Sequence, residues 1–211
     1  MRINTQGLKP LLISPMKAHP LLLFALMPLV EYGRSTQPTP ARANAPTGQQ
    51  VPAAYLQQAV SFIKQVNSRE LANSEFILID SSGTLNSNNC LQYALADKQL
   101  YSAAELKLIE SRAAFWRYQW KKTDFPVIKI ARQDTVRAIF NTRARGWEYF
   151  HKHIGRDFNE FSMPIFFRNN TYCLFYSANY CGDLCAGGSL NLYKKEGARW
   201  RLIKSYCEWV S

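Results

Sequence analysis

The sequence is short of the side chains and motifs from which catalytic and metal sites are usually assembled. It holds only three histidines and five cysteines among 211 residues. It contains no G-x-S-x-G, no P-loop, no H-E-x-x-H and no paired carboxylates at a telling spacing. The C-x3-C pair downstream of an H-x-H does not have the spacing of a structural zinc site. We therefore predict no catalytic residues, no metal site and no cofactor.

One enzymatic alternative remains open, a hydrolase-like protein. Ser162 or Cys185 would be its nucleophile and His153 its base, because such a nucleophile needs a base within hydrogen-bond reach. The pair His151 and His153 also fits the end of a helix, where exposed carbonyl groups favour cations. We prefer the non-catalytic interpretation and keep the hydrolase as its alternative.

The sequence also lacks a concentrated tract of basic residues. It has 26 Lys and Arg against 15 Asp and Glu, a formal charge of +11. Five basic residues and one acidic residue precede Asn44, which leaves 21 against 14 and a charge of +7. The charges are scattered and not interleaved with aromatic residues, which disfavours a nucleic-acid partner. An excess of this sign favours an anionic polysaccharide or another envelope protein.

No hydrophobic run is long enough to cross a bilayer. The apolar run Leu21–Val30 has ten residues, whereas a spanning helix needs about 20 and the core of a signal peptide about 7–15. We expect residues 1–43 to be a signal peptide and extended leader, starting at Met1 or Met16. Residues 44–52 read as a flexible spacer. The prediction is a secreted or periplasmic protein without a transmembrane helix in its mature form.

Export would place the cysteines in an oxidising compartment, where disulfide bonds form. With five cysteines, one thiol is left over. A bond between Cys181 and Cys185 would close a small ring. Cys173 and Cys207 could pair if their strands approach, and Cys90 competes for Cys207, so this part of the connectivity stays open.

The most distinctive segment is C-G-D-L-C-A-G-G, which begins at Cys181. Its glycines supply backbone conformations that other residues disfavour. We take five of its residues as a candidate functional loop, expected in a long connection between two strands: Gly182, Asp183, Leu184, Gly187 and Gly188.

Periodic apolar residues predict several helices and two early strands. Ser102 and Glu105 form a capping box at the start of one helix. Its apolar stripe continues at steps of three and four to Trp116 and Trp120. Other helices are expected at 53–66, 133–140 and 146–153, and strands at 75–80 and 127–131.

The C-terminal part changes to runs of aromatic and β-branched residues. Four such runs cover 161–167, 172–178, 189–195 and 200–209, and short connectors with Asn or Gly favour hairpins between them. We therefore predict a single α+β domain over residues 53–211. In it, N-terminal helices pack on one face of a C-terminal four-stranded antiparallel meander.

Four short motifs carry a resemblance to other proteins. They are Gly146-Trp147 with Phe150, the segment from Phe161 to Phe166, the segment from Cys181 to Gly188, and Gly197 with Trp200 leading to Trp209-Val210-Ser211. Together they resemble a group of uncharacterised secreted bacterial proteins with a G-W-x-x-F helix, an F-S-x-P-x-F strand, a C-G-x-L-C-x-x-G loop and a terminal W-V-S strand. Ala186 stands where that group more often has glycine. The resemblance implies export and an α+β sheet domain, and it brings no established activity.

Overall fold

The computed structural model describes residues 51–85, 89–142 and 146–211, which all belong to one unit of the chain, Asn44–Ser211. The predicted leader, 1–43, lies outside the described residues, as does the predicted spacer up to residue 50. The described helices are α1 (Ala53–Val66), the 3₁₀ helix η1 (Glu70–Ala72), α2 (Cys90–Leu95), α3 (Ala103–Phe115), α4 (Gln133–Asn141) and α5 (Gly146–His153). In this part of the chain, no helix has the length and apolar character needed to span a membrane.

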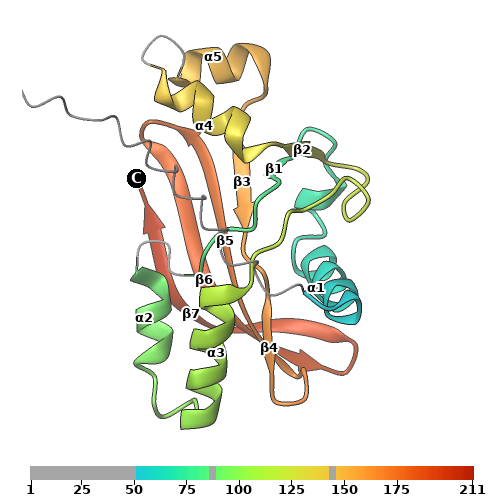
Figure 1. Cartoon of the computed structure of the whole chain (residues 1–211), viewed down its shortest axis with the longest axis vertical. Helices are drawn as coiled ribbons and strands as arrows, with labels where there is room; N and C mark the ends of the chain where they lie inside the picture. The colour runs from blue at the N-terminus through green and yellow to red at the C-terminus, as the bar shows by residue number, and fades with distance from the viewer. Residues whose placement is uncertain (1–50, 86–88, 143–145) are drawn as a thin grey trace, which may run out of the picture. The chain divides into compact units, whose positions relative to one another are not determined.

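The strands form one mixed sheet (Figure 1). They are β1 (Ile77–Ile79), β2 (Lys129–Ala131), β3 (Phe158–Phe161), β4 (Ile165–Phe167), β5 (Tyr172–Gly182), β6 (Cys185–Glu196) and β7 (Arg199–Val210). The order is β2-β1-β3-β5-β6-β7, and β4 also pairs with β5. β1 lies parallel to β2 and β3, whereas the pairs formed by β3 to β7 are antiparallel.

This topology shows that the predicted four-stranded antiparallel meander is wrong. β5, β6 and β7 do follow one another as hairpins, but they belong to a sheet of seven strands, three of them with parallel partners. The run 161–167 is divided between β3 and β4, with Pro164 in the gap, where its missing N–H costs no ladder bond. Strand β1 pairs with β3 through Leu78 and Asn159. Local patterns cannot reveal a pairing between segments so distant in sequence.

The predicted placement of the helices on one face is also wrong, because helices cover both faces of the sheet. Cys173 and Phe175 of β5 pack in the same cluster as Phe62 of α1, and we call their side the α1 face. Leu174 and Tyr176 alternate with them and pack with α2 and α3 on the opposite side, the α3 face. Helices α4 and α5 cover Ile77, Ile79 and Phe158 in a third cluster. Along the chain, helices therefore come before β1 and between the first three strands, and in space they cover both faces of the sheet.

Helix α3 begins as predicted and ends earlier. Glu105 N donates to Ser102 Oγ at 3.3 Å and Ser102 N donates to Glu105 Oε2 at 2.8 Å, so the predicted capping box is confirmed. The helix ends at Phe115, and Trp116 caps it in an extended conformation. Trp120, which is 1% exposed, therefore lies on the α1 face in a cluster to which α3 does not contribute.

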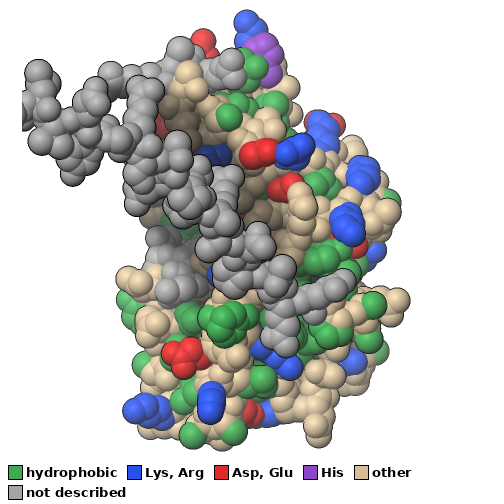
Figure 2. Space-filling model, in the orientation of Figure 1, with side chains coloured by type: hydrophobic (Ala, Val, Ile, Leu, Met, Phe, Trp, Pro, Cys, Tyr) green, Lys and Arg blue, Asp and Glu red, His purple; other side chains and the backbone are tan. Residues whose placement is uncertain are grey.

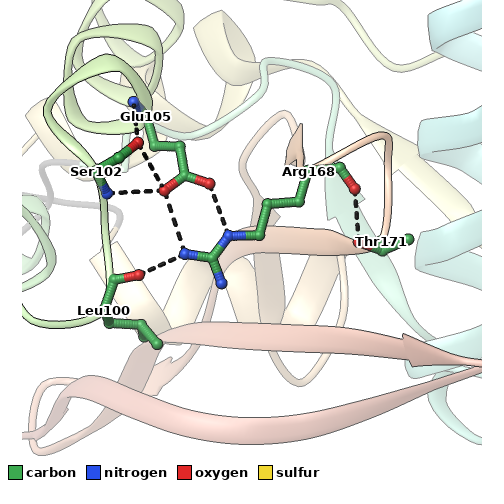
Figure 3. A network of polar contacts seen from close by, with 5 residues as sticks. All are labelled: Leu100, Ser102, Glu105, Arg168 and Thr171. Atoms are coloured by element: carbon green, nitrogen blue, oxygen red, sulfur yellow. Dashed lines mark hydrogen bonds and ion pairs between the residues drawn. The ribbon is translucent and has the colours of Figure 1, made fainter.

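The same cap ties α3 to the sheet, as Figure 3 shows. Arg168, in the turn between β4 and β5, donates from Nε to Glu105 Oε1 at 2.7 Å and also bonds Leu100 O. The Arg168 guanidinium, together with hydrogen bonds from Ser102, lowers the pKa of Glu105 to about 2. The turn itself is tight, with positive φ at Arg168, Asn169 and Asn170.

The expectation of disulfide bonds is confirmed. One bond joins Cys90 of α2 to Cys207 of β7 across a sequence separation of 117, and the other joins Cys181 to Cys185. Cys173 is the leftover thiol and is buried. The competition for Cys207 is thus settled in favour of Cys90, because Cys173 and Cys207 lie on opposite faces of the sheet.

Candidate functional site

The predicted functional loop is the tip of a long hairpin and not a long connection. Strand β5 continues to Gly182 and β6 begins at Cys185, so only Asp183 and Leu184 lie between them. The Cys181–Cys185 bond closes this tip, and Leu184 is 88% exposed. Gly187 and Gly188 lie within β6, so the candidate residues are divided between a tip and a strand.

Both strand glycines make room for close packing. A Cβ at Gly188 would lie 2.7 Å from Nε1 of Trp209 and 2.9 Å from the hydroxyl of Tyr176. That space holds the hydrogen bond of 3.0 Å that Trp209 donates to Tyr176. A Cβ at Gly187 would lie 3.2 Å from the carbonyl oxygen of Trp209, on the other face. Gly187 therefore leaves the α1 face open at this position.

A polar surface occupies the α1 face beyond the reach of α1. The register of β3, β5, β6 and β7 places its side chains in two rows, Asn159–Asn179–Gly187–Val210 and Phe161–Ser177–Ser189–Glu208. Residues two apart in a strand share a face, and directly paired residues lie about 5 Å apart. Amides, hydroxyls and an absent side chain thus follow one another on β3, β5 and β6, whereas Phe161 is aromatic and β7 contributes Val210 and Glu208. We call this surface, with the cavities above it, the amide groove.

Two cavities, of about 450 and 590 Å³, make up the amide groove. They share four lining residues, which are Glu70, Phe76, Asn159 and Asn179. Asn67 and Glu70 border the first cavity where α1 ends, and the segment from Gly155 to Asp157 borders the second. Cavities of this size lie within the usual range of ligand sites, about 300–1,000 Å³.

An amide pair fixes the centre of the floor. Asn179 donates from Nδ2 to Oδ1 of Asn159 at 3.0 Å, and Asn159 donates from Nδ2 to the carbonyl oxygen of Ile77 at 3.2 Å. Asn159 is 7% exposed, so these bonds satisfy a side chain that would be costly to bury unpaired. Asn179 is only partly buried and lines both cavities. The pair therefore holds Asn179 in a set orientation at the groove.

Acidic side chains outnumber basic ones around the groove. Its carboxylates are Glu70, Glu75, Asp157 and Glu208, and Arg156 is the one basic lining residue among those described. Glu75 pairs with Lys129 at 2.6 Å. The local balance is thus opposite in sign to the +11 of the whole chain. On the face shown in Figure 2, lysine and arginine side chains are dispersed among the described residues and form no continuous stripe.

The structure does not bring together the residues of the hydrolase alternative. Ser162 is fully buried and its Oγ accepts a hydrogen bond of 2.9 Å from the backbone N of Tyr176. Cys185 is in a disulfide and has no free thiol. His153 lies at the exposed end of α5, with its ring 4.3 Å from that of Tyr149. Within the described ranges, no group of three or more His, Cys, Asp or Glu side chains is placed to hold a metal ion.

A second polar cluster lies on the α3 face and has no counterpart in the sequence predictions. Burial raises the pKa of Glu160, and a hydrogen bond with Tyr180 offsets part of this effect. Burial and then the nearby Glu160 raise the pKa of Tyr180. Tyr180 in turn contacts Tyr176, which Trp209 holds. The cluster is a polar inclusion in a largely apolar layer.

Comparison with protein-family models, with curated proteins and with solved structures finds no match to this chain.

Proposed function

We propose that the mature chain is an exported, non-catalytic binding domain whose ligand occupies the amide groove. The observation that carries this proposal is the Asn159–Asn179 pair, which holds a polar side chain at the floor shared by two adjoining cavities. Ligand sites combine concave surface with a few precisely placed polar groups. Two disulfides are compatible with an oxidising compartment and thus with export.

The Cys181–Cys185 hairpin supports the same proposal. Its two cysteines line a further cavity of about 530 Å³ together with Arg156 and Asp157, which also line the groove. A short cross-link at this end of β5 and β6 limits the motion of the strands that carry Asn179 and Gly187. Preorganisation of this kind lowers the entropic cost of binding.

A variant that fills the groove tests the proposal. Ser177 lies on the floor, and a β-strand accepts an aromatic residue well. Ser177→Trp should abolish binding of any ligand that a screen of soluble glycans and peptides identifies. Ser111→Trp is the matched control, because Ser111 is exposed on α3 and Trp and Ser have similar helix propensities. Binding that survives Ser177→Trp would show that the groove is not the site.

A further inference from the structure

We infer that the ligand of the amide groove is a short, neutral oligosaccharide. This inference rests on the proposed function and adds a ligand class to it. Three properties of the described residues carry it: the hydrogen-bonding character of the floor, the aromatic rings beside it and the sign of the surrounding charge.

The floor offers donors and acceptors side by side. A side-chain amide has two N–H donors and an oxygen with two lone pairs, and a hydroxyl both donates and accepts. Asn179 donates one side-chain N–H to Asn159, which leaves its other N–H and its side-chain oxygen for a ligand. Ser177 makes no side-chain hydrogen bond among the described residues. Sugar hydroxyls are themselves donors and acceptors, so a floor of this composition matches them without requiring charge.

Aromatic residues adjoin these polar groups. Phe76 lines both cavities, and Phe161 lines one of them. The C–H face of a sugar ring is apolar and favours contact with such surfaces, while its hydroxyls need the amides. The groove thus combines the two surfaces that a sugar ring presents.

The charges select against an acidic glycan. A uronic or sulfated sugar would bring its anions close to Glu70, Asp157 and Glu208, and like charges repel each other. Arg156 is the one basic side chain among the described residues that line the groove, so the excess of Lys and Arg in the chain comes from residues outside this lining. A neutral sugar avoids this repulsion, and its hydroxyl groups donate hydrogen bonds to the carboxylates.

The dimensions favour an oligomer over a single sugar. The rows of the floor cross four strands, and three inter-strand steps of about 4.8 Å span about 14 Å. The second cavity extends this length past Asn179 to Arg156 and Asp157. A chain of several sugar units fits such a floor, with one unit at the amide pair.

Calorimetric titration of the mature chain tests the inference with three probes. These are short oligomers of neutral hexose and N-acetylhexosamine, a polyuronate oligomer of equal length, and a lysine-rich peptide. We expect the neutral oligomers to bind, Asn179→Ala to weaken that binding about tenfold, and Ser177→Trp to abolish it. Ser111→Trp should leave the affinity unchanged, and thermal melting should show that all variants fold.

The outcomes separate the ligand class from the site. If only the polyuronate or the peptide binds and Ser177→Trp abolishes that binding, the ligand class is wrong and the groove remains the site. If a neutral oligomer binds with equal affinity to Ser177→Trp, the groove is not the site and the proposed function fails. If no probe binds, the inference of a neutral oligosaccharide is overturned.

Discussion

Glu160 carries a carboxyl group that its position in the fold makes harder to ionise. Burial raises its pKa above the ordinary value, and the hydrogen bond with Tyr180 compensates only in part. The folded state therefore holds this proton to higher pH than the unfolded state does. The resulting stability is present in full below the unfolded pKa, about 4.3, and is lost as pH rises through the folded pKa.

Glu160→Gln should remove this dependence, because the amide retains a hydrogen-bonding group and cannot ionise. Relative to Glu160→Gln, the wild-type chain should lose free energy of unfolding as the pH rises from about 4 towards neutrality. Urea unfolding of both proteins across this range measures the difference. Parallel stability profiles would mean that Glu160 is solvated as in the unfolded chain.

Cys173 should be chemically inert in the folded protein. Its thiol is fully buried, and burial raises its pKa well above the ordinary value, whereas alkylation requires an exposed thiolate. We expect no label from iodoacetamide on the native chain and one label, at Cys173, after unfolding without reductant. Peptide mapping by mass spectrometry checks both results, and labelling of any other cysteine in the unfolded sample would contradict the disulfide pairing.

The pairing of the two groove asparagines cannot be predicted from the sequence, and the reason is physical. Asn159 and Asn179 are twenty residues apart in the chain and become partners only through the register of β3 against β5. Neither lies in a predicted strand, and an isolated asparagine usually indicates a turn. The predicted functional loop does contain Gly187 and Gly188, which line the groove. The spacing of glycine and cysteine in this segment is unusual, and it can be recognised without knowing which strands pair.

At the scale of single elements, the sequence predicts the ends of a helix correctly where local contacts determine them. The helix at 53–66 and the start of α3 are confirmed, because stripe periodicity and capping act within a few residues. The predicted helix extends past the end of α3 at Phe115, because Trp116 and Trp120 continue its apolar stripe in the sequence. Trp120 N instead bonds Asp80 O, and its indole donates to Phe161 O at 3.3 Å, so tertiary contacts decide the end of the helix.

The cap of α3 gives a prediction at this scale. Arg168→Met keeps the length of the side chain and removes its bonds to Glu105 and Leu100. Glu105 is 17% exposed in its side chain, so loss of a charged hydrogen-bond partner should cost about 2 kcal/mol of unfolding free energy. Urea unfolding measures this cost, and a change within about 0.5 kcal/mol would place the pair among ordinary surface ion pairs.

The acid dependence of the same pair provides a second readout. Since the folded pKa of Glu105 is about 2, its stabilisation is present above the unfolded pKa and is lost as pH falls through about 2. Wild type and Arg168→Met should therefore converge in stability as the solution is acidified below about pH 4. Lys107→Met is the control, because Lys107 is exposed on α3 and outside this network.

At the scale of the whole molecule, the sheet was mispredicted because its order depends on long-range pairing. β1 and β2 have three residues each, too few for a pattern to report their partners. The parallel ladder β2-β1-β3 joins segments from three distant parts of the chain, with helices between them. The hairpins β5-β6-β7 were nearer to the prediction, since each pairing there is between neighbours in sequence.

The two disulfides should contribute very differently to stability. The Cys90–Cys207 bond closes a loop of 117 residues and ties α2 to the edge strand β7, whereas Cys181–Cys185 closes a loop of four. The entropy of the unfolded chain falls more when a longer loop is closed, by about 5 against about 2 kcal/mol at room temperature. Replacing Cys90 and Cys207 by alanine should therefore lower the melting temperature far more than replacing Cys181 and Cys185. The short bond instead restrains the end of β5 and β6 that carries the groove, so its loss should weaken ligand binding while the melting temperature falls less than after loss of the long bond. Differential scanning calorimetry of both double variants checks the order, and equal melting temperatures would show that the long bridge does not limit the unfolded state.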